Sequence, residues 1–184
     1  MQCLRISMTS SVAHARLTTT FTNGLRELPF PKGFSKRFSL ACEVFESFLK
    51  DAKLNGFSQK YKMRSHFYLN VGLVGDQRMR TMNRDFRAKD KTTDVLTLAL
   101  YDDIRAGEEL LFEEVELGDI FISGPVMKKQ AKEFNVTIEQ EFFHLFVHGF
   151  LHLLGFDHEI SPEEEKLMEA LEKKLVDKIY KKIY

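Results

Sequence analysis

Cysteine, net charge and long runs of apolar residues are all scarce in this sequence of 184 residues. Two cysteines, Cys3 and Cys42, are too few to stabilise a chain of this length through disulfides, which favours a reducing compartment. The most apolar stretch, residues 142–156, contains three histidines and is shorter than the roughly 20 residues that a membrane-spanning helix needs. Lys+Arg and Asp+Glu both number 27, so the overall charge neither favours nor excludes a nucleic-acid partner.

The N-terminal region allows two interpretations. Residues 1–26 contain three arginines, many serines and threonines and no acidic residue, a composition typical of an organelle transit peptide. The alternative is an unstructured extension over residues 1–16, followed by a strand at residues 17–22 that ends at Asn23 and Gly24. We favour the second interpretation and expect a cytoplasmic protein, with an organelle matrix as the alternative location.

Residues 17–184 are predicted to form one domain, because the length suffices for a single sizeable core. The spacing of apolar residues indicates helices at 34–54, 77–86 and 125–134, a helix beginning at Thr137 with Gln140 completing a capping box, and a last helix beginning at Ser161. Strands are predicted at 17–22, 65–74, 93–100 and 117–122, and the acidic stretch 101–116 is predicted to be a solvated loop or hairpin. We therefore expect an α+β (α/β-type) domain with a small mixed sheet of about four strands packed against helices.

Three histidines carry the clearest chemical signal. His148 and His152 are four residues apart in a predicted helix, so both side chains lie on one face and can reach one ion. Gly155 stands where that helix should end, since glycine adopts the left-handed conformation without penalty, and His158 can then fold back. Three neutral imidazoles leave the fourth position of a tetrahedral zinc ion open, as in catalytic sites. We predict one zinc ion per chain at the end of this core helix, although imidazole also suits nickel and copper.

The residue after the first histidine bears on the reaction. The spacing matches the HEXXHXXGXXH pattern of zinc peptidases at every position but one. Those enzymes need a glutamate at that position as the general base, whereas this chain has Gly149, which cannot accept a proton. Peptide hydrolysis is therefore disfavoured, and a metallopeptidase-like hydrolase is kept only as the alternative enzyme.

Two neighbouring residues are candidates for supporting the ligands from outside the coordination sphere. His144 lies one turn before His148, but a row at i, i+4 and i+8 turns by about 80° around a helix. We therefore expect His144 to support a ligand or to pack in the core rather than to bind the ion. Asp157 is a candidate for orienting an imidazole by accepting its free N–H, with an ordinary surface turn as the alternative.

A basic segment precedes the histidines. Residues 78–91 hold six basic residues against two aspartates, a composition that usually marks a solvated helix face. Next to a metal site the same residues become candidates for binding phosphate, because arginine pairs with two phosphate oxygens at once.

Three segments form a recognisable set, namely HGFLHLLGFDH at residues 148–158, NRDFRAKDKTTDVL at residues 83–96 and LGDI at residues 117–120. Together they resemble the YbeY family of rRNA maturation endoribonucleases, and their order and spacing agree from about Leu17 to the C-terminus. The family usually has proline where Thr92 stands and Ser-Phe-Pro where residues 97–99 read TLA. These departures bear on substrate preference more than on metal binding.

The resemblance implies a zinc-dependent endoribonuclease that prefers single-stranded RNA and acts in 16S rRNA 3′-end maturation and ribosome quality control. It implies that His148, His152 and His158 are the zinc ligands and that Arg87 is catalytic. We further assign RNA binding to residues near Arg87 in the basic segment, namely Arg84 and Lys89.

The implied partners are ribosomal RNA and the small ribosomal subunit, with ribosome-assembly proteins as further candidates and no membrane. Our hypothesis is metal-assisted phosphodiester cleavage in which Arg87 stabilises the charge that develops on phosphorus. The non-enzymatic alternative is a ribosome-assembly factor that binds rRNA and uses zinc only for stability.

Overall fold

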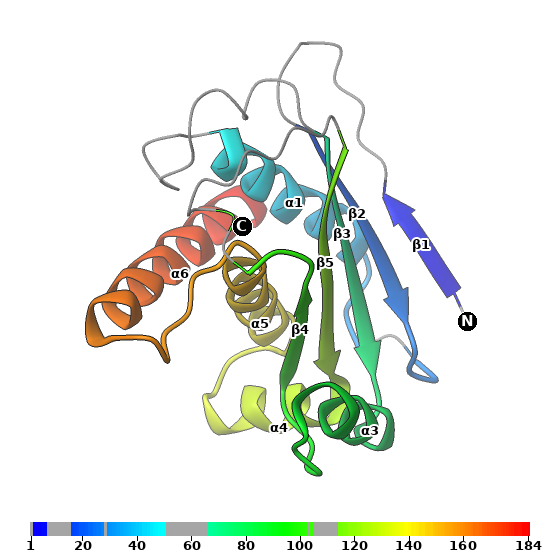
Figure 1. Ribbon diagram of the computed structural model, residues 1–184. Coiled ribbons are helices and arrows are strands. Elements are labelled where there is room, and N and C mark those ends of the chain that lie inside the picture. The colour runs from blue at the N-terminus through cyan, green and yellow to red at the C-terminus, as the bar shows by residue number, and fades with distance from the viewer. Residues whose placement is uncertain (1, 7–15, 28, 51–65, 103, 105–113) are drawn as a thin grey trace.

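A mixed sheet and the helices around it make up the part of the chain that the structure, a computed structural model, describes (Figure 1). The described residues are 2–6, 16–27, 29–50, 66–102, 104 and 114–184. The strands are β1 (Gln2–Ile6), β2 (Arg16–Asn23), β3 (His66–Val74), β4 (Val95–Ala99) and β5 (Glu114–Ser123). The helices are α1 (Phe34–Lys50), α3 (Asp76–Arg87), α4 (Gly124–Glu133), α5 (Ile138–Leu153) and α6 (Pro162–Ile183).

The sheet has five strands in the order β1-β2-β3-β5-β4. The pairs β2–β3 and β3–β5 are parallel, whereas β1–β2 and β4–β5 are antiparallel, so the predicted mixed sheet in an α+β domain is confirmed. All four predicted strands are present, with shifted ends. Residues 105–113 of the predicted acidic loop lie outside the described residues, and its last three residues begin β5.

The fifth strand comes from the N-terminal region. The prediction that residues 1–16 are unstructured is wrong for Gln2–Ile6, which forms β1 and pairs with β2 in the register Gln2↔Asn23 to Ile6↔Thr19. Residues 7–15 lie outside the described part of the chain. The physical reason is that β2 would otherwise present a row of unpaired backbone groups at the sheet edge, which another strand can satisfy.

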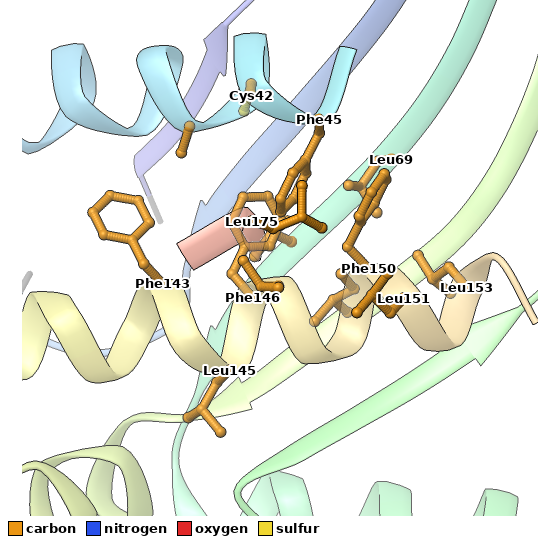
Figure 2. Packing of buried hydrophobic residues seen from close by; sticks show 14 of the residues in the cluster. Cys42, Phe45, Leu69, Phe143, Leu145, Phe146, Phe150, Leu151, Leu153 and Leu175 are labelled. Carbon is orange, nitrogen blue, oxygen red and sulfur yellow. The ribbon is translucent and has the colours of Figure 1, made fainter. Parts of the chain in front are cut away.

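Phenylalanines from two helices fill the core on one face of the sheet. α5 packs against β4 and β5, α1 packs against β2, and α6 covers α1 and α5 from outside. Figure 2 shows Phe143, Phe146 and Phe150 on the side of α5 that faces Cys42 and Phe45 of α1. The rings of Phe45 and Phe150 stack with their centroids 4.0 Å apart. Burying such a ring contributes about 1.5–3 kcal/mol, so these contacts hold α5 firmly in place.

The opposite face of the sheet carries a smaller cluster under α3. Met79 of α3 packs there with Val74 of β3 and Leu96 of β4, and all three are buried. This packing fixes α3 beside the edge strand β4 and so determines where the basic C-terminal turn of α3 lies.

The predicted helix starts are confirmed. Thr137 and Gln140 form a reciprocal capping box at the start of α5, and the Ser161 side chain accepts a hydrogen bond from the backbone of Glu164 at the start of α6. α1 is described as far as Lys50, and residues 51–54 of the predicted helix lie outside the described residues. Among the helices in the described ranges, we find none with the length and apolar character of a membrane span.

Candidate metal centre and active site

The end of α5 presents the three histidines together. His148 and His152 lie one turn apart in the last turns of the helix. Gly155 follows with φ of 89°, and its N–H donates to the carbonyl of His152, so the chain reverses where the sequence predicts. The reversal brings the ring of His158 to 5.4 Å from that of His148 and 5.3 Å from that of His152.

The donor atoms are close enough to share one cation. One ring nitrogen from each of the three histidines lies within 4.8 Å of the others, and the Nε2 atoms of His148 and His152 are 3.1 Å apart. Two imidazole nitrogens on a tetrahedral zinc ion would be about 3.3 Å apart, given Zn–N bonds of about 2.0–2.1 Å. The predicted convergence of the three histidines is confirmed, and the donor set fits a single metal ion.

The protonation state of His152 also suits a ligand. Burial, followed by the neighbouring His148, lowers the pKa of His152 to about 4. The ring is therefore neutral at physiological pH and keeps a nitrogen lone pair for a cation.

A carboxylate from α6 contacts the first histidine. Oε1 of Glu172 lies 2.6 Å from Nδ1 of His148, and both side chains are largely shielded from solvent. Burial, the largest single influence, opposes ionisation of Glu172, but the hydrogen bond with His148 and the electrostatic attraction of His148, His144 and His152 together lower the pKa of the carboxyl. The contact leaves Nε2 as the ring atom that faces His152.

A cavity of about 540 Å³ opens beside the histidines. Its walls come from the end of α3, the following loop, β4, the end of α5 and the turn after it, and the lining residues are Arg87, Lys89, Thr93, Asp94, Val95, Thr97, His148, His152, Asp157, His158 and Glu159. Arg87 is exposed and donates a hydrogen bond of 3.3 Å from its guanidinium to the hydroxyl of Thr97. The cationic side chains of Arg87 and Lys89 thus face the same space as the three imidazoles, which suits an anionic substrate beside a metal ion.

A buried side chain holds the loop that follows Arg87 and carries Lys89. Ala88 ends α3 in the left-handed conformation with φ of 56°. The buried side chain of Asn83 then donates to the carbonyl of Lys91 over 2.8 Å, which ties the loop back to the helix. Asn83 therefore positions the two basic residues at the cavity mouth.

Comparisons with known proteins agree with this site. The family model described as Endoribonuclease YbeY matches residues 36–180, which include all three histidines and Arg87. The chain belongs to the YbeY family.

The alignments with individual relatives in the YbeY family span more than half of this chain and most of each relative. The Endoribonuclease YbeY of Sulfurihydrogenibium sp. is 37% identical over 137 residues, which span 74% of this chain and 85% of that protein. The Endoribonuclease YbeY of Leptospira interrogans is 43% identical over 114 residues, or 56% of this chain and 81% of that protein. The solution structure of TM1509 from Thermotoga maritima is 29% identical, covers 90% of this chain and 89% of that chain, and superposes with a TM-score of 0.52.

Of the other predicted site residues, one lines the cavity of this YbeY site and two are exposed outside its lining. Asp157 lines the cavity, and its Oδ1 accepts a hydrogen bond from the backbone of Glu159, as in the surface-turn alternative. His144 is exposed, so the packed-core interpretation is wrong. Arg84 lies outside the described lining of the cavity and pairs with Asp85 on the exposed face of α3.

Gly149 has a packing role that sequence reasoning missed. A Cβ atom at this position would lie 2.8 Å from Cγ2 of Ile120 and 3.2 Å from Cγ2 of Thr97, because α5 crosses close to β4 and β5 there. A glutamate side chain, as in the zinc peptidases, does not fit at this position. The chain therefore has the histidine spacing of a zinc peptidase but no space for the glutamate that serves as the general base in those enzymes.

Two contacts of the site join residues far apart in the chain and were not predicted. Glu172 lies 24 residues after His148, and Thr97 lies ten after Arg87. The only local signal for Glu172 is its place beside Leu171 in the buried stripe of α6, which sequence reasoning treated as a cover of the core. For Thr97 the local signal is its hydroxyl group, because the serine that the family usually has at this position carries one as well.

Proposed function

We propose that this chain is a zinc-dependent, single-strand-specific endoribonuclease that acts in the 3′-end maturation of 16S rRNA and in ribosome quality control. The observation that carries the proposal is the convergence of three imidazole nitrogens beside Arg87 in one cavity. Membership of the YbeY family supports RNA as the substrate. The proposed substrate implies action in the cytoplasm, on the small ribosomal subunit.

The three histidines would hold the ion, and Glu172 would support the first of them. When bound, a zinc ion supplies Lewis-acid catalysis at a phosphate oxygen. Arg87 has the charge and the fixed donor geometry to bind the phosphate that is being cleaved and to stabilise the negative charge that develops on it. The hydrogen bond to Thr97 holds the guanidinium toward the cavity.

Lys89 and Arg84 would bind neighbouring phosphates of the RNA. Lys89 follows the end of α3 and lines the cavity, whereas Arg84 is exposed on α3, one turn before Arg87 and outside the lining of the cavity. A flexible single strand can place successive phosphates along such a path and still align one of them for in-line attack.

The test combines metal analysis with cleavage of ribosomal RNA. Wild-type protein should contain about one zinc ion per chain and cleave single-stranded RNA, and His152→Ala should lose both properties while remaining folded by circular dichroism. His66→Ala is the matched control, because it removes a histidine of β3 that contacts Thr18 rather than the cavity. Retained RNA cleavage by metal-free His152→Ala would refute the proposal.

The two alternatives predict different results in the same assay. A peptidase would cleave peptides and leave RNA intact, which the lack of space at Gly149 opposes. An assembly factor with a stabilising zinc would unfold when His152 is replaced and would show no RNA turnover in any form.

A further inference from the structure

The last helix contributes a polar side chain to a site whose other residues lie between Arg87 and Glu159. α6 buries a stripe of apolar residues against α1 and α5, namely Met168, Leu171, Leu175 and Ile179. Glu172 follows Leu171 directly and is turned toward α5, where its Oε1 lies 2.6 Å from Nδ1 of His148. The packing of the stripe thus fixes the position of α6 along its axis and its rotation about that axis, and so places the carboxylate of Glu172 beside His148.

The chemistry of the two groups decides which ring nitrogen carries the hydrogen. A carboxylate, the ordinary form of glutamate at neutral pH, can only accept hydrogen bonds. Nδ1 of His148 must therefore donate, and in a neutral imidazole Nε2 then keeps its lone pair. That Nε2 lies 3.1 Å from Nε2 of His152, in the space where a shared ion would sit.

We propose that Glu172 is a positioning residue that fixes the tautomer and orientation of His148 for metal binding. The inference rests on the proposed function, since it assumes that the three histidines hold a metal ion. It differs from the sequence-based prediction, in which Asp157 or His144 had this role. Asp157 accepts instead from the backbone of Glu159, and His144 is exposed.

Loss of the carboxylate has a defined consequence for the ion. Without an acceptor at Nδ1, His148 populates both neutral tautomers, and one of them carries its hydrogen on the nitrogen that should bind the metal. The ring also loses the contact that restricts its rotation. Replacing such supporting partners in metal sites costs about 10- to 100-fold in metal affinity.

The experiment compares zinc affinity in wild type, Glu172→Gln, Glu172→Leu and Glu169→Gln by competition with a chromophoric chelator. Glu169 is exposed on the same helix one turn earlier, so its replacement changes the charge equally without touching His148. We expect the zinc Kd to rise about 10- to 100-fold in Glu172→Leu, to rise less in Glu172→Gln, whose amide oxygen can still accept from Nδ1, and to stay within about twofold in Glu169→Gln. Far-UV circular dichroism and urea unfolding of the metal-free proteins establish that each variant is folded.

A second measurement reports the tautomer without any enzymatic assay. In a long-range ¹H–¹⁵N spectrum of the metal-free protein, His148 should show the Nδ1–H form in wild type and Glu169→Gln, and a mixture of both forms in Glu172→Leu. Equal zinc affinity and an unchanged His148 tautomer in folded Glu172→Leu would overturn the inference. Absence of zinc binding by the wild type would instead refute the proposed function, so the two failures are distinguishable.

Discussion

Replacing Gly149 by alanine is expected to destabilise the protein, although alanine is the better residue for a helix. The gain in helix propensity is about 1 kcal/mol. Against it, the new methyl group would lie 2.8 Å from Cγ2 and 3.2 Å from Cδ1 of Ile120, and 3.2 Å from Cγ2 of Thr97. Ile120 is fully buried and branched at Cβ, so its Cγ2 cannot move aside without leaving the preferred rotamer.

The size of the effect follows from these opposing contributions. Overpacking of a core usually costs about 1–3 kcal/mol. Since α5 is held on its other side by the stacked phenylalanines, it cannot simply move away from the sheet, and we take the upper part of that range. The net loss in the free energy of unfolding should be about 1–2 kcal/mol, equivalent to a fall in Tm of roughly 2–8 °C.

Urea unfolding in a double-mutant cycle with Ile120→Ala tests the cause. Ile120→Ala removes the two Ile120 carbon atoms that the new methyl group would meet and leaves only the longer contact with Cγ2 of Thr97, so adding Gly149→Ala in that background should be neutral or stabilising. Ile120→Val is the matched control, because it removes Cδ1 and keeps the shorter contact. Higher stability of Gly149→Ala in the otherwise wild-type protein, or equal effects in all three backgrounds, would refute the reasoning.

Three further predictions concern the positioning of Arg87, a strained glycine and a buried acid. Thr97→Val should reduce RNA cleavage roughly fivefold, because a hydrogen bond of about 1 kcal/mol to Arg87 is lost, and Thr97→Ser should retain activity; steady-state kinetics on one RNA substrate compare them. Gly118→Ala should lose about 3 kcal/mol or more in urea unfolding, since φ is 129° and a Cβ would lie 2.1 Å from the carbonyl oxygen of Leu98; a loss below 1 kcal/mol contradicts this. Burial raises the pKa of Glu141, so its ionisation costs stability as pH rises above the ordinary value of 4.5. Glu141→Gln should therefore stabilise the protein at pH 7 and lose this advantage below about pH 4 in pH-dependent thermal unfolding; the same gain at every pH would exclude the charge as its cause.

Local signals in the sequence predict the elements that carry the site. The capping box at Thr137 and the spacing of His148, His152 and Gly155 depend on backbone geometry within a few turns, and the structure has each of them in place. The convergence with His158 was predictable for the same reason, because a single helix end and one reversal suffice.

Contacts between distant segments were not predictable in this way. The pairing of β1 with β2 depends on which strand needs a partner at the sheet edge, and the contact of Glu172 with His148 depends on how α6 docks on α5. Neither choice leaves a periodic pattern in the chain. The packing of Gly149 against Ile120 belongs to the same class, since it depends on the distance between a helix and a sheet.

The row of phenylalanines along α5 also determines the angular setting of the metal ligands. Phe146 and Phe150 each precede a histidine by two residues, so each histidine lies about 200° further around the helix axis than its phenylalanine. Stacking of Phe146 on Phe38 and of Phe150 on Phe45 resists any roll of α5 about this axis. A core substitution that lets the helix roll, even by a few tens of degrees, would swing both imidazoles away from His158 while the backbone stays helical. The ring packing on one side of α5 is therefore a determinant of metal affinity on the other.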